Sequence, residues 1–196
     1  FARSDALRNS QPLPAGEMEA KDHLPNSQND SYGGTIGGSR FFDGGYVGLA
    51  ATHYDTDYGI VAEPNVTIGM KQDRLDIAGA FDNPAPTVQK ISYKAGFSNY
   101  KHTEFEGTEV GTVFKNRGYD SRVELSHRPL GLFEGTFGLQ SNLSDFSALG
   151  EEAFLPPTLT ITNSAFILEE IPLGKTTLQL GGRLDNQQVD AKETPS

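Results

Sequence analysis

The sequence predicts an all-β fold, an antiparallel transmembrane β-barrel to which this chain would contribute about eight strands. Three observations lead to this prediction: a composition typical of sheet, strand-like runs that alternate in hydrophobicity, and a regular pattern of connections. The 196 residues include 22 Gly, 12 Phe and seven Tyr, with two Met and no Trp. Glycine and aromatic residues in these proportions favour sheet over a helical bundle.

The elements follow one another in a simple order. The first thirty residues are polar and irregular, with prolines at positions 12, 14 and 25, and we expect 1–30 to be a loop-like extracellular segment. Eight strand-like runs then fill 31–196, at 31–42, 44–57, 66–81, 87–103, 111–128, 132–147, 158–171 and 175–190. They exceed the five or six residues of an ordinary globular strand, whereas a tilted barrel strand needs about nine to eleven residues to cross a bilayer.

Most of these runs alternate as half-buried strands should. In the fourth run, Ile91 and Phe97 fall on one face, and Lys90, Lys94 and Ser98 fall on the other. A soluble β-sandwich would alternate in the same way, so alternation alone leaves both folds open.

The connections favour the barrel. Tight joints are predicted at 42–45, 82–86, 128–131 and 172–175, and long polar joints at 54–66, 102–117 and 145–158. Short and long joints therefore take turns along the chain, as short periplasmic turns and long extracellular loops do in outer-membrane barrels. Sandwiches with Greek-key crossings have no reason to keep this order.

Charge and composition exclude several classes of function. The net charge of −10 and the absence of a Lys/Arg stripe argue against nucleic acid as a partner. No apolar run reaches 18 residues, which excludes a transmembrane helix. Without cysteine there is no disulfide scaffold, thiolate zinc site or Cys nucleophile.

Charged residues recur on the face predicted to line the barrel interior. Paired carboxylates can perform acid–base catalysis, but barrel interiors are normally polar and ion-paired. No nucleophile elbow, phosphate loop or HExxH motif accompanies these charges, so we expect structural ion pairs and no enzyme. The residues are Asp76, Arg122, Glu124, Glu134, Arg183 and Asp185.

One group of side chains has the chemistry of a metal site. Extending the parity of Lys94 and Ser98 places His102, Glu104 and Glu106 on the interior face, at the extracellular mouth. Imidazole nitrogen and carboxylate oxygens are ligands for a divalent cation. Neighbouring same-face positions lie roughly 7 Å apart, so one shared ion would need strand curvature or other loops. The alternative is that these are solvated loop charges.

The other three histidines are weaker candidates. His53 shares the face of Leu49, which predicts a place at the lipid interface. His127 lies beside a tight turn and should be periplasmic, and His23 lies in the irregular start.

Several stretches, taken in order, resemble the barrel of TonB-dependent outer-membrane receptors, in the branch that includes zinc-uptake receptors. The most specific is Gly150–Thr158, which reads GEEAFLPPT. The other stretches are Leu24–Ser27, Gly33–Gly37, Gly45–Ala50, Tyr54–Gly59, Met70–Asp76, Tyr100–Glu104 and Phe114–Tyr119. The resemblance extends over nearly the whole chain.

This resemblance implies a 22-stranded barrel filled by an N-terminal plug domain, importing a metal ion or metal complex with energy relayed by the TonB complex. No plug-like or TonB-binding segment is recognisable, so we expect this chain to be the middle of a larger wall. The implied location is the outer membrane of a Gram-negative bacterium, in contact with its lipid. No cofactor is implied beyond a divalent metal as transported ligand. The 59–65 segment lacks the His-rich insert of the zinc-uptake pattern, which leaves the identity of the metal open.

Two alternatives remain. One is a small self-closed outer-membrane barrel acting as an anchor or adhesin. The other is a soluble β-sandwich binding module, which would need a second sheet to cover outward residues such as Phe137, Leu139 and Leu143.

Overall fold

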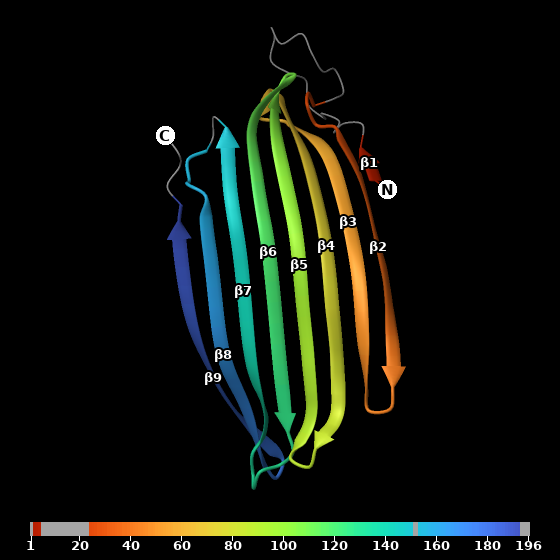
Figure 1. The fold of residues 1–196 in the computed structure, drawn as a ribbon, viewed down its shortest axis with the longest axis vertical. Coiled ribbons are helices and arrows are strands. Elements are labelled where there is room, and N and C mark those ends of the chain that lie inside the picture. Colours follow the sequence, from red (N-terminus) through yellow and green to blue (C-terminus); the bar gives the residue numbers. More distant parts are fainter. Residues whose placement is uncertain (1, 5–23, 151–152, 193–196) are drawn as a thin grey trace.

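The computed structural model describes residues 2–4, 24–150 and 153–192, and these residues form one antiparallel sheet (Figure 1). Each strand pairs with the one before it in the chain, in the order β1 to β9. The strands are β1 Ala2–Ser4, β2 Asn29–Phe42, β3 Gly45–Ile60, β4 Glu63–Ala85, β5 Val88–Glu106, β6 Glu109–His127, β7 Glu134–Gly150, β8 Thr158–Leu173 and β9 Thr176–Ala191. The all-β antiparallel prediction is confirmed, and each predicted run corresponds to one of the strands β2 to β9.

The described part of the chain has no helix long and apolar enough to span a membrane.

The connections differ from the prediction at one end of the sheet. At the lower end in Figure 1, strands are joined through 43–44, 86–87, 128–133 and 174–175, close to the predicted tight joints. At the upper end, the connections are 61–62, 107–108 and 151–157. The long joints predicted at 54–66 and 102–117 are therefore wrong, since β3, β4, β5 and β6 run through them to two-residue turns.

The physical reason is strand pairing within segments that look like polar loops. Thr103 pairs with Val113 and Gly59 with Thr67, so these backbones satisfy their hydrogen bonds in the sheet. The two ends of the sheet still differ, because the strands extend further beyond their apolar residues at the upper end than at the lower end. In β4, twelve positions separate Leu75 from the strand's upper end at Glu63, and four separate Phe81 from its lower end at Ala85.

Glycine makes two of the predicted tight turns. Gly44 and Gly174 have φ values of 82° and 67°, a region that costs glycine little because it has no Cβ atom. These turns lie at positions where the sequence predicts a reversal.

The segment 1–30 is only partly described. Ala2–Ser4 pairs with Asn29–Ser31, so the prediction of a continuous loop is wrong for its two ends. Residues 1 and 5–23 lie outside the described residues. Asn26 is held against the β3–β4 connection, because its side-chain amide donates to the carbonyls of Ile60 and Glu63 at 2.9 and 2.8 Å.

Alternation gives the sheet two different faces. We call the side that carries Arg74, Arg122 and Arg183 the arginine face, and the opposite side the leucine face. The leucine face carries Leu75, Leu139 and Leu184 among others, and Leu139 is 65% exposed. The predicted division of polar and apolar residues between faces is confirmed by the pairing register.

The arginine face is the more crowded of the two. A Cβ atom built on Gly96 would clash with the Arg74 side chain, and one on Gly138 would clash with the Phe166 ring. On the leucine face, a Cβ atom built on Gly38 would have no heavy atom within 4 Å. Gly79 is an exception on the leucine face, since a Cβ atom there would lie 2.6 Å from the Tyr93 ring. The buried apolar residues Ile68, Ala80 and Ala148 all lie on the arginine face.

The sheet is open within the described residues. β2 and β9 lie at opposite sides of it in Figure 1 and do not pair with each other. Every residue of β9 is exposed, and its only described neighbour is β8. Closure into a barrel therefore remains a prediction.

Candidate functional site

The predicted metal-site residues lie at the upper end of β5. His102 pairs with Met70 of β4 and Phe114 of β6, which places it on the arginine face as the parity predicts. Glu104 lies on the same face, two positions closer to the hairpin. Glu106 is the last residue of β5 and pairs with Glu109 across the turn.

His102 is held among aromatic side chains. Its Nδ1 lies 3.2 Å from the hydroxyl of Tyr100, and its ring meets that of Phe114 edge-on with centroids 5.3 Å apart. Phe114 in turn lies 6.5 Å from Phe146. We call Tyr100, His102, Phe114 and Phe146 the histidine–aromatic cluster.

Glu104 supplies the acidic group nearest to this cluster. Its Oε1 lies 3.8 Å from His102 Nε2, and the two side chains are 18% and 19% exposed. At that separation Nε2 makes no hydrogen bond, and it is buried without a hydrogen-bond partner among the described residues. Thr56 lies in the same cross-strand row, since it pairs with Met70 and Met70 pairs with His102. Its Oγ1 is also buried without a hydrogen-bond partner among the described residues.

Burial lowers the pKa of His102 below that of a free imidazole, since a low-polarity environment disfavours the cation. The neutral ring is the form that binds a metal ion or accepts a hydrogen bond. The cluster thus presents an imidazole nitrogen and a carboxylate in a partly desolvated, aromatic setting.

A complete metal site is not formed by these residues alone. Within 24–150 and 153–192, no three or more His, Cys, Asp or Glu side chains are grouped so that they could hold a metal ion. His102 and Glu104 are brought close together, and the role of Glu106 as a third ligand stays a prediction.

Sequence reasoning missed the aromatic members of this cluster. Tyr100, Phe114 and Phe146 share the parity of His102 once the strands are paired. Their alternation is visible in the sequence, but the predicted loop at 102–117 hid the pairing of Phe114 with His102.

The charged side chains of the arginine face form the ion pairs expected of them. Arg74 Nη2 lies 2.7 Å from Asp76 and 2.9 Å from Asp120, so it joins β4 to β6. Arg122 pairs with Glu124, and its guanidinium lies 4.2 Å from the centre of the Phe166 ring.

The same network continues across β7 to β9. Arg183 pairs with Asp185 at 2.8 Å, and Gln140 Oε1 accepts from both Arg122 and Arg183 at 3.4 and 3.3 Å. The predicted ion pairing is confirmed for Asp76, Arg122, Glu124, Arg183 and Asp185.

The remaining histidines lie away from the cluster. His53 Nδ1 lies 2.7 Å from Asp73 Oδ1 on the leucine face, the face that parity predicts. His127 lies beside the 128–133 connection as predicted, with Nδ1 2.8 Å from the Arg128 carbonyl and Nε2 3.1 Å from Glu169. His23 lies outside the described residues.

No family model matches this chain.

Proposed function

We propose that this chain is part of the wall of an outer-membrane β-barrel. The observation that carries the proposal is the uncovered apolar surface of the leucine face. Three of four successive cross-strand rows there are rich in apolar side chains, and the fourth is apolar from β3 to β5 and polar at Ser121, Ser141 and Asn163. No second layer covers these rows among the described residues. Exposed members include Ile36, Leu49, Leu75, Phe97, Val123, Phe137, Leu139 and Leu184.

This surface covers part of the height of a bilayer. Its top row includes Leu75 and its bottom row Phe81, an interval of about 20 Å along a strand, which corresponds to about 15 Å along the membrane normal at the usual strand tilt. The apolar band of an outer-membrane barrel is roughly 25 Å tall and has aromatic residues at its edges. Phe42 and Phe81 lie at the lower edge with ring centroids 5.8 Å apart, and Tyr93 follows at 6.4 Å from Phe81.

The arginine face suits the interior of such a barrel. Its ion pairs and amide bridges satisfy charged groups within the sheet, as polar barrel interiors do. Its crowding is expected for the concave side of a closed wall.

The open edges favour a wall with further strands over a small self-closed barrel. Among the described residues β9 pairs only with β8, and its outer backbone groups need a further neighbour because a barrel leaves no unpaired edge. A soluble sandwich is less favoured, since it would need a second sheet over the leucine face.

Within this class, we propose a TonB-dependent receptor that imports a metal ion or metal complex. The basis is the resemblance over most of the chain, most specific at Gly150–Thr158. The histidine–aromatic cluster and Glu104 would contribute to the ligand site at the extracellular mouth of the interior. The TonB complex and outer-membrane lipid would be its partners.

The barrel proposal is tested with the intact natural polypeptide that carries this chain. We expect it to fractionate with outer membranes, to require detergent, and to migrate faster on an SDS gel before boiling than after, as compact barrels do. A folded monomer that stays in solution without detergent would contradict the proposal.

The transport proposal needs a separate test in the natural host. Inactivating the gene should lower the cellular content of one transition metal under metal limitation, measured by mass spectrometry. The wild-type gene should restore that content, and a His102→Ala/Glu104→Ala variant should restore less. Unchanged content of every metal would contradict the metal assignment and leave the barrel proposal intact.

A further inference from the structure

The leucine face carries basic side chains above its apolar rows, and the row that contains His53, Asp73 and Asn99 lies between the lysines and the apolar side chains. Lys71 pairs with Lys101, and Lys101 pairs with Lys115, so three lysines occupy neighbouring positions on three adjacent strands. Adjacent strands lie about 4.8 Å apart. Arg117 lies on the same face, one row closer to the apolar surface. We call these four residues the basic row.

Only one member of the basic row forms an ion pair among the described residues, and Asp145, which lies directly opposite Arg117, is paired with Lys192. Lys71 is paired with Asp55 at 2.9 Å. For Lys101, Lys115 and Arg117, no carboxylate of the described residues lies within ion-pair distance, and all three are exposed. Like charges directly opposite each other destabilise an antiparallel pair, so an anion bound across this row would stabilise the sheet. These basic side chains lie next to one another although the chain as a whole has a net charge of −10.

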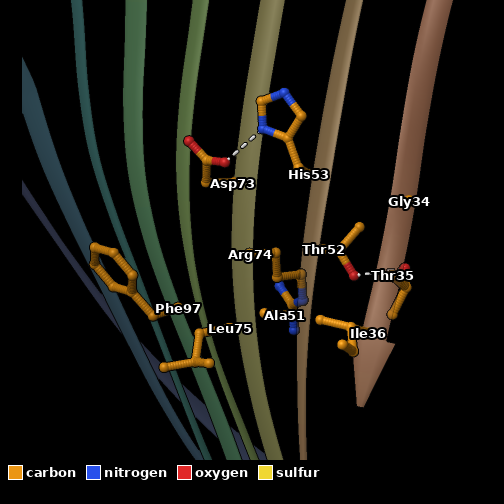
Figure 2. Close-up of a pocket in the computed structure, with 10 residues that line it drawn as sticks. All are labelled: Gly34, Thr35, Ile36, Ala51, Thr52, His53, Asp73, Arg74, Leu75 and Phe97. Atoms are coloured by element: carbon orange, nitrogen blue, oxygen red, sulfur yellow. Dashed lines mark hydrogen bonds and ion pairs between the residues drawn. The ribbon is translucent and has the colours of Figure 1, made fainter.

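An apolar groove lies beside this row on the same face (Figure 2). Its volume is about 590 Å³, and Gly34 and Ala51 leave it open between the larger side chains of Ile36, Leu75 and Phe97. The hydrogen-bonded His53 and Asp73 lie at one end of the groove in Figure 2, with Leu75 and Phe97 further down the strands.

The order of these features along the strands matches one kind of ligand. From the lower end upward, the leucine face presents apolar rows, then the row that contains Asp73 and Arg117, then Lys101 and Lys115. A phosphorylated lipid has the same order, with acyl chains followed by an anionic headgroup. Basic side chains next to an apolar surface bind such headgroups by charge and leave the chains on the apolar rows.

We propose that Lys101, Lys115 and Arg117 bind the phosphate of a phosphorylated lipid whose acyl chains lie on the apolar rows below, including the groove beside Leu75 and Phe97. This inference rests on the proposed membrane location of the leucine face. It goes further by naming the lipid class and the residues that bind it. The basic row would then mark the level of the headgroups at the upper edge of the apolar band.

The test compares two variants with equal loss of charge in the intact natural polypeptide, purified in a neutral detergent. One is Lys101→Gln/Lys115→Gln/Arg117→Gln. The matched control is Lys90→Gln/Lys94→Gln/Lys175→Gln, whose positions lie on the arginine face or in the β8–β9 turn. Heat-modifiable migration on an SDS gel shows that each variant is folded.

Binding is measured by native mass spectrometry with dioleoyl phosphatidic acid, dioleoyl phosphatidylcholine and inorganic phosphate as separate probes. We expect the wild type and the control to bind phosphatidic acid more tightly than phosphatidylcholine. The basic-row variant should lose affinity for phosphatidic acid on the order of 100-fold, since each basic group near an anionic membrane surface contributes about fivefold.

Equal losses in both triple variants would overturn the inference, because net charge alone would then explain binding. Inorganic phosphate that displaces the lipid at equal concentration would also overturn it, because the site would then select a free anion. If the protein is a detergent-requiring barrel and the basic-row variant binds lipid like the wild type, only this inference fails. If the protein is soluble without detergent, the proposed function fails and this inference falls with it.

Discussion

Gly138 lies on the arginine face directly opposite Phe166, whose ring occupies the space that a side chain at 138 would need. The ring also lies under the guanidinium of Arg122, so its position matters to the ion-pair network. At the residue scale, glycine is therefore a packing requirement here, and not only a source of backbone freedom.

We predict that Gly138→Ala lowers stability by about 1–3 kcal/mol, because the added methyl group forces Phe166 off its position over Gly138. Gly38→Ala is the matched control, since nothing lies within 4 Å of its Cβ position, and it should change stability by less than about 0.5 kcal/mol. Urea unfolding of the detergent-solubilised protein measures both. Equal effects would show that the arginine face is no more crowded than the leucine face.

Asp55 illustrates how a single buried carboxylate joins three strands above the apolar rows. Its side chain is 6% exposed, and its Oδ2 accepts from Lys71 and from the Tyr32 hydroxyl, each at 2.9 Å. The hydrogen bond from Lys71 contributes most to lowering the pKa of Asp55, followed by that from Tyr32, while burial opposes them. The charged form is therefore the one that the fold stabilises.

We predict that Asp55→Asn costs about 1.5 kcal/mol at pH 7, because the charged hydrogen bonds are lost. The pKa is lower in the folded protein, so the contribution is present above the ordinary Asp pKa of about 4 and disappears as pH falls through the folded value. Thermal unfolding at pH 7, 4 and 2.5 should thus show the wild type and the variant converging in acid. A difference that stays constant with pH would contradict this account.

At the scale of elements, the strands reach further than the sequence pattern suggests. β5 and β6 continue through the predicted loop 102–117 and pair to within a two-residue turn. The polar composition of this segment indicates exposure to water, and a strand outside a bilayer can be exposed in the same way as a loop.

The chain has no cysteine, which allows a clean test of this extension. We predict that Thr103→Cys/Val113→Cys forms a disulfide under mild oxidation, because the two positions are paired across the strands. Thr103→Cys/Lys115→Cys, displaced by two residues on the same face, should cross-link far less. Mass spectrometry of the digested protein detects the linked peptides, and equal yields would indicate a flexible loop.

At the scale of the whole molecule, the polarity of each face determines whether that face is suited to water or to lipid. Leu139 lies in the middle of the apolar rows and is 65% exposed in the isolated sheet. In water a lysine would be tolerated at such a position, whereas at the middle of a bilayer it is costly.

We predict that Leu139→Lys destabilises the protein by about 2–4 kcal/mol in lipid vesicles, the usual cost of a basic residue at the bilayer midplane of a barrel. Asn142→Lys, on the arginine face, should be tolerated because the interior is polar. Equilibrium urea unfolding in vesicles compares the two. If Leu139→Lys costs no more than Asn142→Lys, the leucine face does not contact lipid.

The sequence by itself determined the strands, the two faces and the tight turns, since these depend on local alternation and on glycines such as Gly44 and Gly174. It also placed His102 and Glu104 on one face, because side-chain direction in a strand follows parity. Only the tertiary structure decided the cross-strand register, which depends on contacts between residues distant in sequence. That register extended the strands beyond their apolar part, surrounded His102 with aromatic rings, and aligned Lys71, Lys101 and Lys115 in one row.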